Sequence, residues 1–316
     1  MSKERELILV LGADGFIGSN LIKKLLKKNK YKIRAFDLFK DGKTKNLKNI
    51  ENKIEIFSGN FLNRNDLRNA LKDVDYVFHF ISLTTPGSSM EDPFIDVDTN
   101  IKGTLGLFEE CVNAGTKKII FSSSGGAIYG NSNSEFQSEE DNTNPISPYA
   151  ISKLVIEKYL EYYRLNKGLD YLVLRYANPY GPGQNVVGGQ GIIPIFLNLI
   201  KQNKCIHIFG DGENIRDYIY IDDMIDMTIQ IFSKNTKYTI YNIGSGKGES
   251  INNVIKTIQT VVGKNISTVK QPERLIDVRR IVLDVSRVYE EINFIPKITL
   301  SRGIMKTWKW INNIKN

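Results

Sequence analysis

Two side chains four residues apart have the chemistry for proton transfer. Tyr149 and Lys153 lie in the stretch SPYAISK, where Ser147 can cap a helix and Pro148 suits its first turn. Residues four apart share one helical face, so we expect the phenol and the ammonium one above the other. The Y-x-x-x-K spacing is common on amphipathic helices, and it indicates catalysis only with independent support.

A glycine-rich turn near the start of the chain indicates a dinucleotide site. Gly12, Gly15 and Gly18 form a G-x-x-G-x-x-G pattern between an apolar run and a helical pattern. Glycines allow a tight turn and bring backbone amides close to a pyrophosphate at the helix N-terminus. Asp37 ends the next predicted strand, where a carboxylate accepts hydrogen bonds from an adenosine ribose and repels a 2′-phosphate. The pattern therefore favours NAD over NADP.

Serines follow a predicted buried strand, at the position where doubly wound sheets bind ligands. The run is Ser122-Ser123-Ser124. Beside an oxidised nicotinamide, a serine, a tyrosine and a lysine make a proton-transfer set. The lysine and the nicotinamide are both cationic, so both favour the phenolate and lower the pKa of the tyrosine. The serine hydroxyl shares a hydrogen bond with the reacting oxygen.

The elements that position these residues alternate regularly along the first half of the chain. The predicted strands are 7–11, 31–36, 54–58, 76–80, 118–121 and 171–174, with a helix over 16–28. This order predicts an α/β fold with a Rossmann-type doubly wound parallel sheet. Glycine and proline become more frequent after Arg175. We predict an NAD-binding domain over 1–176, to which a segment near 217–245 returns, and a smaller α/β substrate domain over 177–316.

The composition is that of an ordinary globular protein. The 316 residues are 41% hydrophobic and 25% charged, without an apolar run as long as a membrane span. The net charge of +8 comes from lysines spread along the chain, with the densest cluster, Lys40–Lys48, in a polar loop. Solvated surface lysines explain this charge better than a nucleic-acid groove. We expect neither nucleic acid nor a membrane as a partner.

Cysteine and histidine usage argues against a disulfide framework and a metal site. Cys111 and Cys205 lie far apart, and His79 and His207 show no metal-ligand spacing with them. The start of the chain continues directly into the glycine turn and does not have the pattern of a signal peptide. A cytoplasmic location is the expectation.

Taken together, these motifs resemble the extended short-chain dehydrogenases/reductases, in the NAD-dependent epimerase/dehydratase family. Within it, the chain is similar to nucleotide-sugar epimerases typified by UDP-glucose 4-epimerase. The resemblance covers almost the whole chain and continues in RYANPYGPGQ (175–184), GDGENIRDYIYIDD (210–223) and PERLIDVRR (272–280). It implies that Ser124, Tyr149 and Lys153 are catalytic.

The resemblance implies a reversible oxidation at sugar carbon 4, with NAD as a cofactor that is not consumed. Dehydratases and decarboxylases of the superfamily carry acidic residues before the Tyr-Gly pair, whereas this chain has Gly125, Gly126 and Ala127. Epimerisation of UDP-glucose and UDP-galactose is therefore expected. The alternatives are a UDP-N-acetylglucosamine or UDP-uronate 4-epimerase, an NAD(P)H-dependent reductase, and a sensor that has lost catalysis.

The resemblance also assigns cofactor contacts, with some departures from the family pattern. The cofactor-binding residues that it implies are Gly12, Gly15, Phe16, Ile17, Gly18, Asp37, Asn60, Phe61, Phe80, Asn100, Ser122, Tyr149, Lys153 and Tyr176. Asn60 stands where relatives have aspartate, and its carbonyl can accept from the adenine amino group. The serine segment is one residue longer than in well-known epimerases, so Ser123 is the alternative to Ser124. We interpret His79 as a packed strand residue.

Substrate contacts implied by the resemblance lie mostly in the second half. They are Ser124, Tyr149, Asn178, Ile192, Phe209, Arg216, Arg274, Asp277 and Ile281. Asn178 and the two arginines are expected at the diphosphate, Asp277 at the ribose and Phe209 at the uracil. Ile281 either walls the sugar pocket, disfavouring N-acetylated sugars, or simply packs in a strand.

Relatives dimerise through a bundle of four helices, two from each subunit. The corresponding helices here are about 97–113 and 148–167. Leu105, Phe108, Tyr159 and Tyr163 are expected either at such an interface or in the core of the chain.

Overall fold

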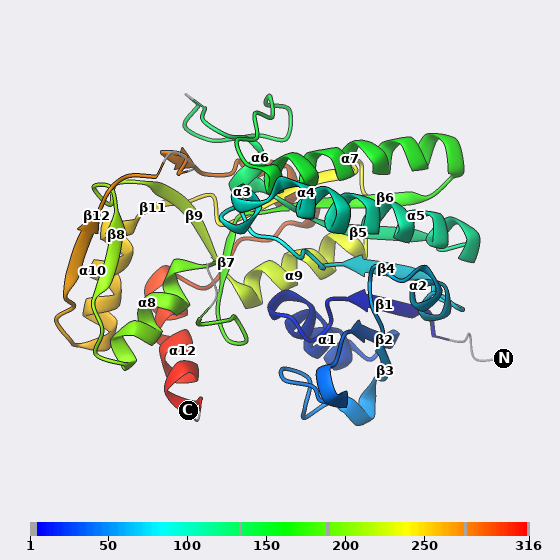
Figure 1. The fold of residues 1–316 in the computed structure, drawn as a ribbon, viewed down its shortest axis with the longest axis horizontal. Coiled ribbons are helices and arrows are strands. Elements are labelled where there is room, and N and C mark those ends of the chain that lie inside the picture. Colours follow the sequence, from blue (N-terminus) through cyan, green and yellow to red (C-terminus); the bar gives the residue numbers. More distant parts are fainter. Residues whose placement is uncertain (1–4, 133, 188–189, 275–276, 315–316) are drawn as a thin grey trace. The chain divides into compact units, whose positions relative to one another are not determined.

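The computed structural model describes residues 5–132, 134–187, 190–274 and 277–314. The chain divides into two compact units (Figure 1). The first consists of Met1–Ser123, Pro148–Leu174 and Phe232–Ile240, and the second of Ser124–Ser147, Arg175–Ile231 and Tyr241–Asn316. None of the helices in the described ranges is long and apolar enough to cross a bilayer.

A seven-stranded sheet, most of whose strands lie in the first unit, confirms the predicted fold class. Its order is β10-β6-β5-β4-β1-β2-β3, and the pairs joining β1 to β2 and β4, β2 to β3, and β4 to β5 are parallel. The strands are β1 (Leu7–Leu11), β2 (Lys32–Asp37), β3 (Glu55–Ser58), β4 (Tyr76–His79), β5 (Lys118–Ser124), β6 (Asp170–Tyr176) and β10 (Ile240–Ile243). The reversal between β1 and β4 is the switch point at which doubly wound sheets bind ligands.

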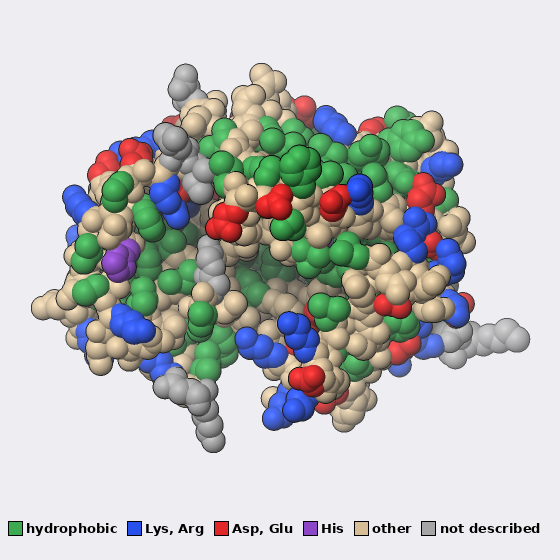
Figure 2. Space-filling model, viewed as in Figure 1, with side chains coloured by type: hydrophobic (Ala, Val, Ile, Leu, Met, Phe, Trp, Pro, Cys, Tyr) green, Lys and Arg blue, Asp and Glu red, His purple; other side chains and the backbone are tan. Residues whose placement is uncertain are grey.

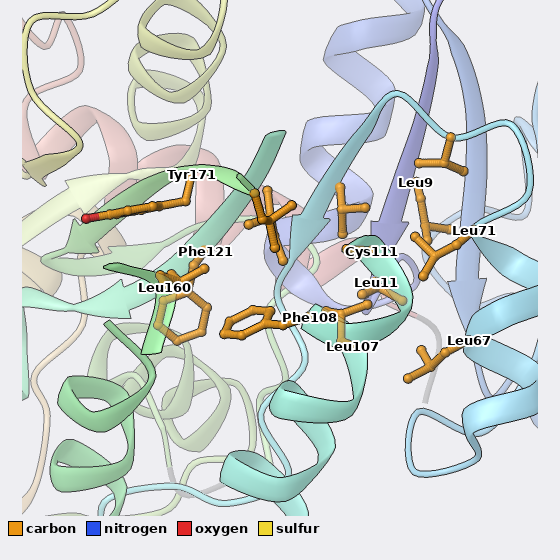
Figure 3. Packing of buried hydrophobic residues seen from close by; sticks show 14 of the residues in the cluster. Leu9, Leu11, Leu67, Leu71, Leu107, Phe108, Cys111, Phe121, Leu160 and Tyr171 are labelled. Atoms are coloured by element: carbon orange, nitrogen blue, oxygen red, sulfur yellow. The ribbon is translucent and has the colours of Figure 1, made fainter. Parts of the chain in front are cut away.

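Alternating residues of these strands build the core of the first unit. Leu9 and Leu11 of β1 and Phe121 of β5 point to the same side of the sheet, where they pack with Leu107 and Leu160 (Figure 3). These partners come from α5 (Lys102–Ala114) and α7 (Pro148–Lys167). The helix α1 (Phe16–Lys28) lies on the other side of the sheet (Figure 1). A parallel sheet covered on both faces explains why its strands are nearly continuous apolar runs.

The helices of the first unit begin and end close to the predicted positions. The helix α1 has the predicted bounds, and α7 has those of the second predicted dimer helix. The other predicted dimer helix is divided into a π-helical turn, η3 (Val97–Ile101), and α5. The remaining elements are η1 (Lys40–Gly42), η2 (Glu51–Lys53), α2 (Arg64–Ala70), α3 (Ser88–Glu91) and α4 (Pro93–Asp96).

The second unit has two smaller sheets. One has the order β11-β9-β13, with β7 also paired to β9, and the other pairs β12 with β8. The strands are β7 (Asn178–Tyr180), β8 (Ile206–Phe209), β9 (Ile215–Tyr220), β11 (Gly248–Ser250), β12 (Thr268–Gln271) and β13 (Arg280–Ile281). The helices are α6 (Gly125–Ile128), α8 (Ile192–Lys201), α9 (Ile221–Phe232), α10 (Ile251–Val262), α11 (Ser286–Ile292) and α12 (Leu300–Asn313).

Candidate active site

The glycine turn of the first unit has the geometry that a pyrophosphate needs. Gly12 has φ +78°, and a Cβ atom on Gly18 would lie 2.2 Å from the carbonyl oxygen of Gly12. Gly15 is the N-cap of α1, and no side chain caps the helix there. The amides at this N-terminus, including those of Phe16 and Ile17, are therefore left for an anionic ligand. These residues fit NAD.

Asp37 lies at the end of β2, beside the glycine turn. Its Oδ2 atom accepts a hydrogen bond of 3.0 Å from the N–H of Asp14, and its Oδ1 atom accepts one from Leu38. Burial raises the pKa of the Asp37 carboxyl, and these two hydrogen bonds oppose that shift. Each oxygen keeps a second lone pair for a ribose hydroxyl.

Asp14 is a residue of this site that the sequence reasoning missed. Its carboxylate accepts hydrogen bonds from three successive backbone amides, those of Lys45, Asn46 and Leu47, at 2.6–3.1 Å. The Asn46 side chain also donates to the Asp14 carbonyl at 2.7 Å. Asp14 therefore fixes the lysine-rich loop against the glycine turn and Asp37. An acidic residue inside a glycine motif was the only signal, since its partners lie about thirty residues away.

The residues predicted to contact the adenine and the nicotinamide differ in whether their side chains are accessible to a cofactor. The Oδ1 atom of Asn60 accepts a hydrogen bond of 2.9 Å from the Leu62 amide and keeps a second lone pair. Phe61 is a core residue, so only its backbone is open to a cofactor. Phe80 is half-buried, and its backbone lies 3.3 Å from a Cβ atom built on Gly12. The residues after β4 thus border the glycine turn.

Asn100 forms structural hydrogen bonds in addition to its predicted cofactor contact. The residue is buried in η3, and its Oδ1 atom accepts a hydrogen bond of 2.9 Å from the Leu83 amide. Its Nδ2 atom donates to Thr84 and to Asp96 at 2.7 and 2.9 Å. Asn100 therefore fixes the loop that follows β4.

Tyr149 and Lys153 lie together at the start of α7, as predicted. The Nζ atom of Lys153 is 5.6 Å from the centre of the Tyr149 ring and 4.8 Å from that of Phe121. It donates a hydrogen bond of 2.8 Å to the carbonyl oxygen of Ser122. Burial lowers the pKa of Lys153 to about 8, while nearby carboxylates raise it. An ammonium with this pKa can respond to proton transfer near neutral pH.

The strand β5 extends through all three serines, although the prediction ended it at Phe121. Ser123 is buried, and its hydroxyl donates to the carboxylate of Glu157. Ser124 is the N-cap of α6, where its hydroxyl caps no amide. The Ser123 hydroxyl is thus already bonded to a buried carboxylate, whereas the Ser124 hydroxyl does not cap the helix.

His79 is a packed strand residue, which confirms its interpretation from the sequence. The imidazole is buried, with Nε2 at 3.0 Å from the Thr104 hydroxyl and rings of Phe61 and Phe121 beside it. Burial lowers its pKa to about 3. In the part of the chain that the structure describes, no group of three or more His, Cys, Asp or Glu residues could hold a metal ion.

In the second unit, Asn178 lies beside the glycine segment. Its Nδ2 atom donates to the carbonyl oxygen of Asp217 at 3.1 Å and is 3.4 Å from a Cβ atom built on Gly126. Tyr176 is buried, and its hydroxyl is bonded to Thr228 at 3.0 Å. Its ring is therefore unavailable to a cofactor, and only its backbone fits the predicted contact.

The structure brings together four residues predicted to bind the nucleotide. The guanidinium of Arg274 lies 4.2 Å from the centre of the Phe209 ring and forms a bidentate ion pair with Asp277 at 2.9 and 3.0 Å. Burial lowers the pKa of Arg216, with Asp277 raising it and Arg274 lowering it. Among the described residues, Arg216 has no carboxylate within ion-pair distance. It is the stronger candidate for an anionic ligand, since Arg274 already has a partner.

Ile281 and Ile192 differ in accessibility. Ile281 in β13 is 1% exposed and pairs in register with Arg216. Its burial supports the packing interpretation over a wall of the sugar pocket. Ile192 is half-buried and begins α8 after Gly191, which has φ +84°.

The chain matches the model of the NAD dependent epimerase/dehydratase family over residues 8–244. A putative UDP-glucose 4-epimerase of Methanocaldococcus jannaschii is 35% identical over 97% of this chain and 99% of its own. The UDP-glucose 4-epimerase of Thermotoga maritima, solved with UDP-glucose, is 36% identical, with a TM-score of 0.90 over 97% of this chain and 98% of that one. The Thermus thermophilus UDP-glucose 4-epimerase, solved with NAD, is 30% identical, with a TM-score of 0.89 over 97% and 99%.

The glycine turn, Asp37 and the Tyr149–Lys153 pair agree with this match, which covers both the fold and nearly the full length. The cofactor is NAD, and the chain belongs to the NAD-dependent epimerase/dehydratase family of enzymes.

Proposed function

We propose that this enzyme is a 4-epimerase that interconverts UDP-glucose and UDP-galactose. The observation that carries the proposal is the pairing of Tyr149 with Lys153, whose ammonium is held on the Ser122 carbonyl in the unit that contains the glycine turn. Relatives named for this reaction support the substrate. Others are named for UDP-glucuronate and UDP-N-acetylglucosamine, and the buried Ile281 gives no steric reason to exclude them.

Bound NAD supplies reversible hydride transfer at sugar carbon 4. In the proposed reaction, Tyr149 takes the proton of the 4-hydroxyl as the C–H bond breaks, leaving a 4-keto sugar. Lys153 stabilises the phenolate with its positive charge, and Ser124 donates a hydrogen bond to the reacting oxygen. Tyr149 then returns the proton when the opposite face of the ketone is reduced. No electrons are gained or lost overall.

The glycine segment supports epimerisation over elimination of water. A Cβ atom on Gly125 would lie 2.7 Å from Leu283 and 3.0 Å from the carbonyl oxygen of Arg175. Gly125, Gly126 and Ala127 leave the segment before Tyr129 without an acidic side chain, whereas dehydratases carry acids in this segment. The proposed enzyme therefore lacks the acid needed to protonate a leaving hydroxyl.

The nucleotide is assigned to the second unit. Arg216 provides an arginine fork that has no carboxylate partner in the described part of the chain, which suits a diphosphate. Asn178 is proposed as a second donor to the diphosphate. Arg274, Asp277 and Phe209 lie together as a cation, a ribose acceptor and an aromatic surface. We assign the first unit to NAD and this unit to the UDP portion.

We further propose a homodimer formed by α7 and the segment before α5. Phe94 of α4 and Leu165 of α7 are 77% and 70% exposed. Other exposed apolar residues of this face are Met90, Ile95, Val97, Ile151, Tyr159 and Tyr162. Figure 2 shows hydrophobic side chains gathered where Figure 1 draws α7. Phe108 and Tyr163 pack in the core of the chain instead. A second copy of this face is the proposed occupant, since an apolar patch of this kind marks an association site.

We also infer a cytoplasmic location, where the two free thiols would stay reduced.

The test is incubation of the purified protein with UDP-galactose, UDP-N-acetylgalactosamine and UDP-galacturonate separately, without added reductant. Proton NMR of the anomeric signals distinguishes the galacto and gluco isomers. Conversion of UDP-galactose at the highest rate supports the proposal, and faster conversion of another sugar reassigns the substrate. A requirement for NADPH, or no interconversion of any sugar, contradicts epimerisation.

A further inference from the structure

Two buried carboxylates lie near the ammonium of Lys153 in the first unit. Asp96 at the end of α4 is 0% exposed, Glu157 in α7 is 3% exposed, and Lys153 itself is 5% exposed. Glu157 follows Lys153 by one helical turn, so the two side chains share a face of α7. Burying a carboxylate is costly unless it has hydrogen bonds and a nearby positive charge. The burial of Asp96 and Glu157 therefore requires stabilising contacts in the interior.

Asp96 is held by side chains from three segments. Its Oδ1 atom accepts hydrogen bonds from the hydroxyl of Thr84 and, at 2.9 Å, from the amide of Asn100. Its Oδ2 atom accepts one from the hydroxyl of Ser152, the residue before Lys153. The carboxylate thus joins the loop after β4, the π-helical turn and the catalytic helix. Thr84, Asn100 and Ser152 are neutral, so these bonds fix the position of Asp96 without cancelling its charge.

Glu157 is also bonded to a side-chain hydroxyl. It accepts a hydrogen bond from the hydroxyl of Ser123, next to the residue whose carbonyl binds Lys153. His79 also interacts with Lys153, but the low pKa of about 3 keeps that imidazole uncharged near neutral pH. Tyr149 is another titratable neighbour of Lys153. Among the described residues, the charged groups acting on the ammonium are Asp96 and Glu157, and both raise the pKa that burial lowers.

We propose that Asp96 and Glu157 are positioning residues that keep Lys153 in its ammonium form and fixed on the Ser122 carbonyl. The inference rests on the proposed function, in which this positive charge stabilises the phenolate of Tyr149. Burial alone favours a neutral amine, which could not provide that charge. Two fixed anions oppose this effect without forming a direct ion pair. Lys153 therefore stays charged while its Nζ atom remains free to bond the carbonyl.

The experiment measures the titration of Lys153 itself, in the NAD-bound protein. Lysine labelled with ¹³C at Cε gives NMR signals that report protonation, and Lys153→Arg identifies the Lys153 signal by its loss. Asp96→Asn and Glu157→Gln remove one charge each while keeping the shape of the side chain. Asp98→Asn is the matched control, because Asp98 lies two residues from Asp96 but is exposed and paired with Lys102. We expect each buried variant to lower the Lys153 pKa by about one unit or more and Asp98→Asn to leave it unchanged.

Ser152→Ala separates charge from hydrogen bonding, since it removes a donor to Asp96 and leaves the carboxylate. An Lys153 pKa that is unchanged in both Asp96→Asn and Glu157→Gln overturns the proposal. A fall in Ser152→Ala as large as that in Asp96→Asn also overturns it, because charge is then not the cause. The NMR titration requires no sugar substrate. Failure of the proposed function would appear instead as wild-type protein that converts none of the three sugars. If conversion occurs, the alkaline limit of turnover should fall with the Lys153 pKa.

Discussion

The hydroxyl of Ser123 donates a hydrogen bond to the carboxylate of Glu157, which lies 34 residues later in the chain. Both residues are buried, so this bond satisfies a carboxylate in the interior of the first unit. A hydroxyl held in this way is poorly suited to follow a reacting oxygen. The relationship therefore bears directly on which serine serves catalysis.

We expect Ser124→Ala to lower turnover by about 10²-fold, as loss of one donor to a reacting oxygen does. Ser123→Ala should lower turnover far less but reduce the free energy of unfolding by about 1–3 kcal/mol, because Glu157 loses a donor. Turnover of UDP-galactose and urea unfolding of both variants measure this. A larger loss of turnover in Ser123→Ala would reverse the assignment.

Replacing Tyr149 with Phe removes the proposed acid/base hydroxyl and keeps the aromatic ring. We expect turnover to fall by roughly 10²–10⁴-fold, the range of general acid–base catalysis, while NAD stays bound. Tyr162→Phe, on the exposed side of the same helix, should behave like the wild type. Turnover and the NAD content of the purified variants are compared. Tyr149→Phe with most of its turnover would exclude Tyr149 as the base.

Asp14→Asn should weaken NAD binding, because an amide cannot accept hydrogen bonds from all three amides of the loop over residues 45–47. Loss of this anchor also disturbs Asp37, to which the Asp14 N–H is bonded. We expect the dissociation constant for NAD to rise at least about tenfold, equivalent to 1.4 kcal/mol. Calorimetric titration of NAD-depleted protein measures it. Asp41→Asn, an exposed acid of the same loop, is the control, and equal losses in both would contradict the role of Asp14.

Local patterns were enough to predict much of the fold. The strand β1 and the helices α1 and α7 have the predicted bounds, because apolar periodicity, glycines and a proline define them within the segment itself. The extension of β5 through the serines was missed, since three polar residues do not resemble a buried strand. Ser123 is buried against Glu157, and the Ser122 carbonyl accepts a hydrogen bond from Lys153, and both partners are distant in sequence.

In the candidate site as well, features that depend on residues distant in sequence could not be predicted. Asp96 and Asp98 occupy the polar stretch DPFIDVDTN, and no local feature indicates that one is buried and the other exposed. Only packing against Ser152 and Asn100 separates them. Arg274 and Asp277 were predicted as two separate ligand contacts, but their spacing also allows the ion pair that they form with each other.

Charging the proposed dimer face should separate the subunits. Phe94→Asp combined with Leu165→Asp places two carboxylates in an apolar contact, where their desolvation opposes association. Light scattering after size exclusion, at several protein concentrations, is expected to give a dimer for the wild type and a monomer for the double variant. Ile295→Asp changes a similarly exposed residue of the second unit and should leave the dimer intact. A monomeric wild type would refute the proposed interface.

His79 should make the protein less stable in mild acid. Its imidazole stays neutral in the folded protein down to a pKa of about 3, whereas the unfolded chain binds a proton near the ordinary value of 6.5. Between these two values the unfolded state holds more protons, so the free energy of unfolding falls as the pH falls. From pH 7 to pH 5 this contribution to the free energy of unfolding is about 2 kcal/mol.

We therefore expect the free energy of unfolding of His79→Gln, measured by urea unfolding, to fall by about 2 kcal/mol less than that of the wild type over this range. His207→Gln, which changes an exposed histidine, should keep the full decrease. Equal decreases in wild type and His79→Gln would mean that His79 is protonated in the folded protein at pH 5.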